Sequence, residues 1–104
     1  MAKTPEKKVK DQVTKLLSNS NVYWFYPVMG GYGSSGIPDI VACYRGMFIG
    51  IECKAGDNKP TALQMKNLNQ ISTAGGYSAV INETNIEDLN ALLARIDAER
   101  KAPN

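Results

Sequence analysis

The chain contains no histidine, and this absence excludes several kinds of chemistry. Ser-His-Asp hydrolysis, histidine general bases and zinc-hydroxide sites built on imidazole all need a residue that the protein lacks. Only two cysteines are present, Cys43 and Cys53, too few to complete a structural zinc site of the usual kind without histidine. Carboxylate and carbonyl oxygens remain as ligands, and these suit Mg²⁺ or Mn²⁺.

Long apolar runs are missing as well. No stretch approaches the roughly 20 apolar residues of a membrane-spanning helix, and the N-terminus has no apolar segment typical of a secretion signal. We therefore expect a cytoplasmic protein without a membrane partner. With 104 residues and 43% hydrophobic content, residues 1–104 are expected to form one domain with a modest core.

The net charge of +2 is small, but it is unevenly distributed along the chain. Residues 1–60 carry eight Lys and Arg against five Asp and Glu, whereas residues 61–104 carry four against five. A basic excess in one part of a chain fits a nucleic-acid contact surface. A solvated basic helix accounts for it equally well.

Hydrophobic periodicity and capping residues predict seven elements. We expect helices over residues 5–18, 61–74 and 85–99, and strands over 22–26, 37–44, 47–54 and 77–81. Thr84-x-x-Glu87 matches a capping box for the last helix. The order αβββαβα predicts an α/β fold with a mixed, mostly buried central sheet flanked by helices. Candidate core residues of the helices are Val9, Val13, Leu16, Leu17, Leu63, Leu68, Ile71, Ile86, Leu89, Leu92, Leu93 and Ile96.

The predicted hairpin places two acids opposite each other. Arg45-Gly46 reads as a two-residue turn, so Tyr44 would face Met47. Asp39 and Glu52 would then share one sheet face, with Cβ atoms roughly 4.5–5.5 Å apart, where like charges repel. Lys54 on the same face supplies one positive charge to offset this repulsion, and a divalent cation would supply the remaining positive charge. A three-residue loop would instead shift the pairing by one and separate the acids.

Two interpretations of this acid pair are open: a metal site for phosphodiester chemistry, or two unrelated solvated charges. The residues around the acids are apolar on both faces of both strands, which is typical of strands buried on both sides. Buried acids need a partner or a metal, which favours the metal site. In the same register Cys43 and Cys53 project from opposite faces, so we expect no disulfide between them.

Two further polar residues have competing interpretations. Glu6 lies near the middle of the apolar stripe of the first helix, where it is either a site residue or a first-turn acid favoured by the helix dipole. Gln64 is a second site candidate, but Thr61-x-x-Gln64 also matches a capping box. One side-chain amide cannot serve both roles in the same conformation.

The segment Gly31–Gly36 matches G-x-G-x-x-G, but the predicted strand follows it where a dinucleotide loop needs a helix, so we expect no nucleotide cofactor. Ser34 and Ser35 in this loop either donate to phosphate or serve as turn residues; with Lys10 they are our candidate DNA contacts. The aromatic segment around Trp24 is either a base-stacking platform or strand packing.

Pro38-Asp39, then a strand ending in Glu52-Cys53-Lys54, resembles the motif of the PD-(D/E)XK nuclease superfamily, whose core order is αβββαβ. The chain looks more narrowly like a stand-alone VRR-NUC domain. The further points of likeness are Glu6 on the first helix, Gly36-Ile37 before Pro38, Gln64 early in the next helix, and Gly75-Gly76 before the last core strand. The resemblance covers roughly residues 5–97.

This resemblance implies a restriction-endonuclease-like fold and a role for each matching residue. Asp39, Glu52 and the backbone carbonyl of Cys53 would bind Mg²⁺ or Mn²⁺. Lys54 would position or deprotonate the attacking water, and Glu6 and Gln64 would complete the pocket.

The implied activity is that of a metal-dependent deoxyribonuclease, expected as a homodimer or higher oligomer cutting branched DNA such as Holliday junctions. A small nuclease of this kind would suit a phage or mobile element acting in the cytoplasm of a host cell. The alternatives are a nicking or degradative nuclease without junction preference, a non-catalytic DNA-binding module on the same fold, and an interaction protein whose acid pair is merely solvated.

Overall fold

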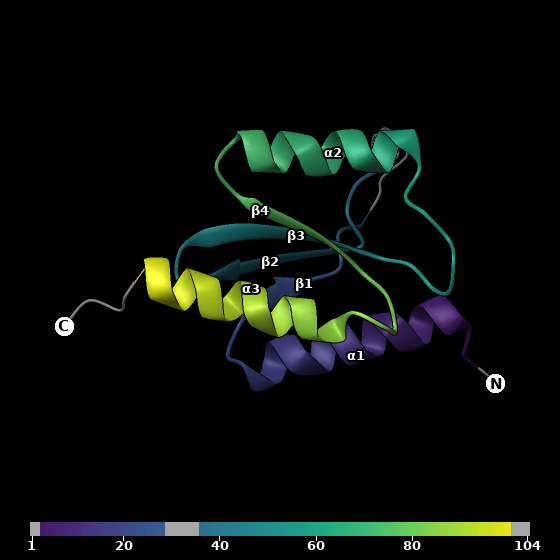
Figure 1. The fold of residues 1–104 in the computed structure, drawn as a ribbon, viewed down its shortest axis with the longest axis horizontal. Coiled ribbons are helices and arrows are strands. Elements are labelled where there is room, and N and C mark those ends of the chain that lie inside the picture. The colour runs from purple at the N-terminus through teal and green to yellow at the C-terminus, as the bar shows by residue number, and fades with distance from the viewer. Residues whose placement is uncertain (1–2, 29–35, 101–104) are drawn as a thin grey trace.

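The computed structural model describes residues 3–28 and 36–100 (Figure 1). Along the chain the elements are α1 (Pro5–Asn19), β1 (Tyr23–Phe25), β2 (Ile40–Tyr44), β3 (Met47–Cys53), α2 (Ala62–Thr73), β4 (Tyr77–Ile81) and α3 (Ile86–Glu99). The predicted order αβββαβα and the α/β class are therefore confirmed.

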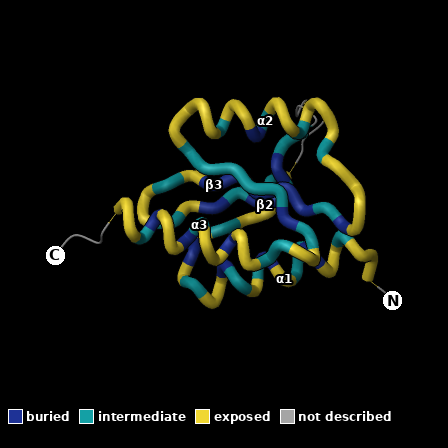
Figure 2. Tube along the Cα trace, in the orientation of Figure 1, coloured by how far each residue is buried: buried dark blue, intermediate teal, exposed yellow. Residues whose placement is uncertain are grey.

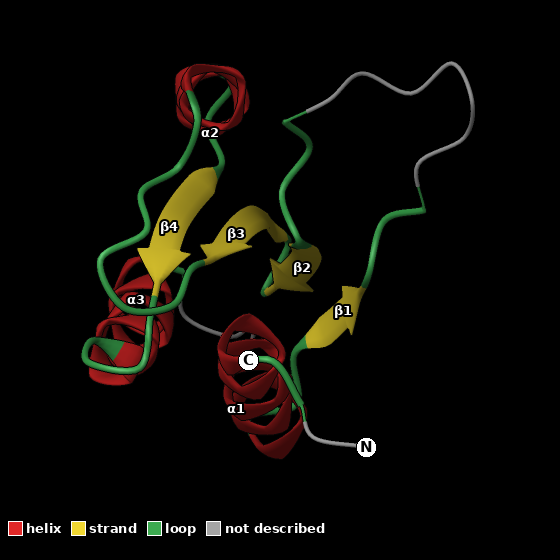
Figure 3. Cartoon of the chain, turned by 90° about the vertical axis from the view of Figure 1, so that its right-hand side faces the viewer, coloured by secondary structure: helices red, strands yellow, loops and turns green. Residues whose placement is uncertain are grey.

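The described strands form one mixed sheet in the order β1-β2-β3-β4. Strands β1, β2 and β3 pair antiparallel to one another in this order, whereas β4 runs parallel to β3, with α2 as the connection between β3 and β4. Helices α1 and α3 cover one face of the sheet, and α2 lies on the other face (Figures 1 and 3).

Two of the three predicted helix starts form as expected. The Thr4 hydroxyl accepts from Lys7 N at 3.1 Å, with Pro5 in the first turn of α1. The predicted Thr84-x-x-Glu87 capping box of α3 is wrong. Asn85 is the N-cap, and it makes no side-chain cap bond. Its side chain instead accepts from Asn82 N and donates to Val80 O, which ties the β4–α3 turn to the end of the sheet.

The core lies between the sheet and the pair α1 and α3 (Figure 2). One face of the β2–β3 hairpin supplies Ile40, Ala42, Ile49 and Ile51, all at most 1% exposed. Helical spacing brings the apolar stripes of α1 and α3 onto this face. The buried helix residues are Val9, Val13, Leu17, Leu89, Leu93 and Ile96, as the periodicity predicted.

The opposite sheet face is only partly covered, so the prediction that both faces of the hairpin are buried holds for residues 49–53 of β3 and is wrong nearer the turn. Cys43 on β2 is exposed, because α2 packs over β3 and β4 and leaves the β1–β2 side free of any described helix (Figure 3). Phe48, next to the hairpin turn on β3, is 47% exposed. Trp24 points to the α1 side, where its indole N–H donates to Ser18 Oγ at 2.8 Å, which supports strand packing for this residue.

Helix α2 approaches β3 closely at a glycine. A Cβ placed on Gly50 would lie 2.5 Å from Ile71 Cδ1 and 3.1 Å from Pro38 Cγ, so a larger residue there would require the Ile71 side chain to move. Leu68 is buried, but the predicted core residue Leu63 is 51% exposed. The two leucines are five positions apart, which is about 140° around a helix, so they cannot share one buried face.

Candidate active site

The hairpin register is the one predicted from the two-residue turn. Tyr44 pairs with Met47 and Ile40 with Ile51. The turn residues Arg45 and Gly46 have φ values of 51° and 81°, the left-handed conformation that such a turn requires. Extending this register by one pair sets Asp39 against Glu52, and the separation that a three-residue loop would cause does not occur.

Asp39 lies just before β2 and is held by the backbone of the neighbouring strand. Its Oδ2 accepts a hydrogen bond from Cys53 N at 2.8 Å. The other oxygen, Oδ1, faces Lys10 Nζ at 3.7 Å, and the side chain is 21% exposed. The hydrogen bond to Oδ2 thus fixes the carboxylate, while Oδ1 remains on the side of Lys10.

Glu52 is the one buried charged residue among those described, at 1% exposure. Its Oε2 lies 3.6 Å from Lys54 Nζ, whereas its buried Oε1 has no hydrogen-bond partner within the described residues. Burial, and then the negative charge of Asp39, raise the pKa of Glu52 to about 7. The position of Glu52 therefore disfavours the ionised carboxylate, and within the described residues it leaves Oε1 without a hydrogen bond.

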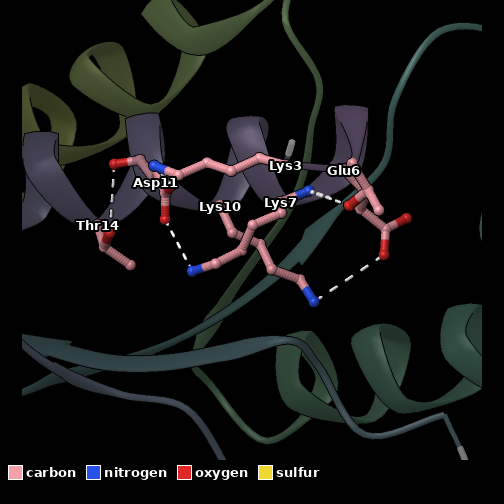
Figure 4. A network of polar contacts seen from close by, with 7 residues as sticks. Lys3, Glu6, Lys7, Lys10, Asp11 and Thr14 are labelled. Carbon is pink, nitrogen blue, oxygen red and sulfur yellow. Dashed lines mark hydrogen bonds and ion pairs between the residues drawn. The ribbon is translucent and has the colours of Figure 1, made fainter. Parts of the chain in front are cut away.

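Lys10 adds a second ammonium group to the site from α1. Its Nζ lies 3.7 Å from Asp39 Oδ1 and 3.9 Å from Glu6 Oε2, which brings Glu6 into the neighbourhood of Asp39. Figure 4 shows Lys10 and Lys7 on the same side of α1, with Lys10 reaching toward Glu6 and Lys7 toward Asp11. Glu6 is 39% exposed rather than buried, so its contribution to the site runs through Lys10.

Gln64 serves the capping box. Its Oε1 accepts from Thr61 N at 2.8 Å, and Thr61 Oγ1 accepts from Gln64 N at 3.2 Å. The side-chain oxygen that a site role would use is therefore occupied by the start of α2. The remaining DNA-contact candidates, Ser34 and Ser35, and most of the G-x-G-x-x-G segment lie outside the described residues.

Asp39 also borders an open cavity of about 390 Å³ between α1 and the ends of β1 and β2. This cavity was not predicted from the sequence, although Lys7 and Lys10 are three residues apart and so share one side of α1. Lys7 Nζ lies 5.7 Å from the centre of the Tyr26 ring. The lining residues are Lys7, Lys10, Tyr26, Pro27, Ile37, Pro38 and Asp39.

The donor set near Glu52 fits a hard divalent cation in part. Within residues 3–28 and 36–100, no group of three or more His, Cys, Asp and Glu side chains is arranged to hold a metal ion. Among the described residues, Glu52 Oε1 and Asp39 Oδ1 nevertheless accept no hydrogen bond, although Lys10 Nζ lies 3.7 Å from Asp39 Oδ1. Oxygen ligands of this kind suit Mg²⁺ or Mn²⁺, whose remaining positions can be filled by carbonyl oxygens and water.

The Cys53 side chain lies in the core with Ile49 and Ile51, on the sheet face opposite to the acid pair, so its sulfur is turned away from Asp39 and Glu52. Burial and the nearby negative charges raise the pKa of its thiol to about 12. Both cysteines are free; Cys53 is buried, whereas Cys43 is exposed, contrary to the predicted burial of both hairpin faces.

Comparison with known proteins adds no assignment: no family model matches the chain, and no curated protein matches it significantly. None of the described helices has the length and apolar character needed to cross a bilayer.

Proposed function

We propose that the protein is a metal-dependent deoxyribonuclease with a restriction-endonuclease-like fold of the PD-(D/E)XK type, similar to stand-alone VRR-NUC domains. The observation that carries the proposal is that Oε1 of buried Glu52, beside Asp39, has no hydrogen-bond partner in the part of the chain that the structure describes. Burying the Glu52 carboxylate beside the negative charge of Asp39 costs stability, since Lys54 Nζ at 3.6 Å from Oε2 offsets that charge only in part. A divalent cation removes that cost.

In this proposal Asp39 Oδ1, Glu52 Oε1 and the backbone carbonyl of Cys53 hold Mg²⁺ or Mn²⁺. The bond from Cys53 N to Asp39 Oδ2 supports this arrangement, because it fixes the carboxylate and the strand end that would carry the carbonyl ligand. When bound, the cation would polarise the scissile phosphate and lower the pKa of its water.

We propose that Lys54 acts on the water molecule that attacks the phosphate. Its side chain is only 14% exposed, and its Nζ lies 3.6 Å from Glu52 Oε2, so it is held at the acid pair rather than in bulk solvent. From there it can position the water, take its proton, or stabilise charge on the phosphate. Glu6 completes the site by holding Lys10, and Gln64 by fixing the start of α2.

Lys54→Ala should lower the cleavage rate by about 10² to 10⁴-fold, the usual contribution of a positioned acid or base. The dissociation constant for DNA should change by less than about threefold, because Lys54 lies at the acid pair and not in the open cavity. Single-turnover cleavage and filter binding on the same substrate separate the two effects. Equal losses in rate and in binding would show that Lys54 is a binding residue.

The substrate we propose is branched DNA, cut by a homodimer in the cytoplasm of the cell that contains the protein. Resolving a four-way junction needs paired cuts on symmetry-related strands, which a two-fold dimer places naturally. Exposed aromatic side chains on the uncovered part of the sheet, Tyr23 at 70% and Phe48 at 47%, support an interface there.

Sedimentation equilibrium at micromolar concentration should therefore give twice the chain mass of 11.3 kDa, or a higher multiple. Tyr23→Lys should shift the equilibrium toward monomer, because it puts a charge into the proposed interface. A monomer mass for the unaltered protein under these conditions would contradict the dimer.

One cleavage assay tests the activity. Pure protein is incubated with a labelled four-way junction and with a linear duplex of matching sequence, in Mg²⁺, Mn²⁺ or EDTA. Symmetric, metal-dependent cuts in the junction alone support the proposal. Cuts in both substrates would indicate a nicking or degradative nuclease, and binding without cuts would indicate a non-catalytic module.

A further inference from the structure

We propose that Lys10 is an internal counter-ion of the acid site, which a bound metal ion displaces and which then contacts a phosphate of the substrate. This inference rests on the proposed function, since it concerns the same metal site and the same polyanionic substrate. Lys10 then has two successive partners: Asp39 in the metal-free protein, and a substrate phosphate in the protein with metal and DNA bound.

The first observation is that Lys10 is held loosely. Its Nζ is 3.7 Å from Asp39 Oδ1 and 3.9 Å from Glu6 Oε2, both longer than a direct charge-assisted hydrogen bond. Its neighbour Lys7 is bound tightly by comparison, at 2.9 Å from Asp11 Oδ1. An ammonium group between two acids with no short bond to either can leave at little cost.

The second observation is that Lys10 uses the oxygen that the metal needs. Asp39 Oδ2 is taken by Cys53 N, so Oδ1 is the oxygen left for coordination, and Lys10 lies against it. A divalent cation bound to Oδ1 would stand a few ångströms from this ammonium group, and the two would repel. Lys10 and the metal therefore compete for Asp39.

The third observation is that the cavity beside Asp39 offers Lys10 a place to go. Lys10 already lines this open space of about 390 Å³, together with Lys7 and the ring of Tyr26. Two ammonium groups and an aromatic ring beside the cleavage site suit the phosphate and base of a nucleotide next to the scissile bond. Released from Asp39, Lys10 can turn toward that phosphate without rearrangement of α1.

Lys10→Met tests the competition, since methionine keeps the apolar stem and removes the charge. Mn²⁺ is titrated calorimetrically into the unaltered full chain, Lys10→Met and Lys10→Gln, without nucleic acid. We expect Mn²⁺ to bind both variants about fivefold or more tightly, because a competing positive charge is gone. The matched control is Lys8→Met, an exposed lysine about 200° away around α1, which should leave Mn²⁺ affinity unchanged.

The second arm measures DNA binding in the Lys54→Met background, where cleavage does not interfere. With Mn²⁺ present, Lys10→Met should weaken binding of a duplex and reduce the slope of log affinity against log salt by about one unit, as the loss of one phosphate contact predicts. In EDTA the loss in affinity should be smaller, because Lys10 is then engaged by Asp39.

The outcomes distinguish this inference from the proposed function. If the unaltered chain binds Mn²⁺ but Lys10→Met and Lys10→Gln bind it equally well or less well, the counter-ion role is wrong and the metal site stands. An equal loss of DNA affinity with Mn²⁺ and with EDTA would likewise overturn the exchange of partners. If neither the unaltered chain nor the variants bind Mn²⁺, both proposals fall together.

Discussion

Asp39→Asn should lower metal-dependent cleavage by about 10³-fold or more. The asparagine keeps an oxygen that can accept from Cys53 N, so the 2.8 Å contact that ties the start of β2 to β3 is retained. The neutral amide cannot replace the carboxylate as a metal ligand, however, and losing several kcal/mol of charge stabilisation costs about tenfold for each 1.4 kcal/mol. Initial rates on the four-way junction in Mg²⁺ measure the effect.

Asp39→Ala is the less informative variant, because it also removes the acceptor for Cys53 N and so mixes a folding defect with the loss of metal. Asp57→Asn is the matched control, since Asp57 is an exposed acid in the loop between β3 and α2. Its activity should stay within about twofold of the unaltered protein. Full activity of Asp39→Asn would show that the Asp39 carboxylate is not needed for cleavage.

Glu52→Gln should stabilise the metal-free protein at pH 8. The side chain is 1% exposed, and one of its oxygens has no hydrogen-bond partner among the described residues. Glutamine resembles the protonated acid and carries no charge to bury, so it avoids the penalty that ionised Glu52 imposes on the fold. The variant should gain on the order of 3 kcal/mol in free energy of unfolding, from the rise of the Glu52 pKa from 4.5 to about 7.

The pH dependence has a definite sign. Burial and the charge of Asp39 raise the pKa of Glu52 from its ordinary value of 4.5 to about 7, so between these values the folded state binds the proton more tightly than the unfolded state does. The free energy of unfolding contributed by Glu52 is fully present below pH 4.5 and is lost as the pH rises to about 7. Glu52→Gln should remove this dependence.

Urea denaturation in EDTA at pH 5 and pH 8 tests the prediction, with the exposed acid of Glu87→Gln as control. The unaltered protein and Glu52→Gln should have similar free energies of unfolding at pH 5, and Glu52→Gln should be the more stable of the two at pH 8. Saturating Mn²⁺ should make the unaltered protein the more stable one at pH 8, because the cation stabilises the carboxylate and not the amide. A variant less stable than the unaltered protein at pH 8 in EDTA would mean that Glu52 is satisfied without a metal.

The parts of this site that follow from local rules were predictable from sequence. Arg45-Gly46 determines the hairpin register, because a two-residue turn leaves one pairing, and that register sets Asp39 against Glu52. Thr61 and Gln64 form the expected capping box, since both partners lie within one helical turn. Thr84 failed as a cap for a local reason too, because Asn85 bonds to Val80 O and starts the helix one residue later.

What depends on the placement of one element against another was not predictable. Lys10 meets Asp39 only because α1 packs across the sheet at the angle that the core allows, and no spacing in the sequence encodes that contact. The same limit applies to the partial cover of the sheet. The apolar residues Cys43 and Phe48 indicate burial by composition, yet α2 lies over β3 and β4 and leaves them exposed.

Diffraction from a crystal soaked in Mn²⁺, with anomalous data collected, tests the central claim most directly. We predict one anomalous peak between Asp39 Oδ1 and Glu52 Oε1, about 2 Å from each oxygen, with Lys10 Nζ moved from Asp39 into the neighbouring cavity. Glu52 Oε1, which no group of residues 3–28 and 36–100 hydrogen-bonds, would then have a partner. Bound Mn²⁺ at other surface acids, with none between these two carboxylates, would contradict the account.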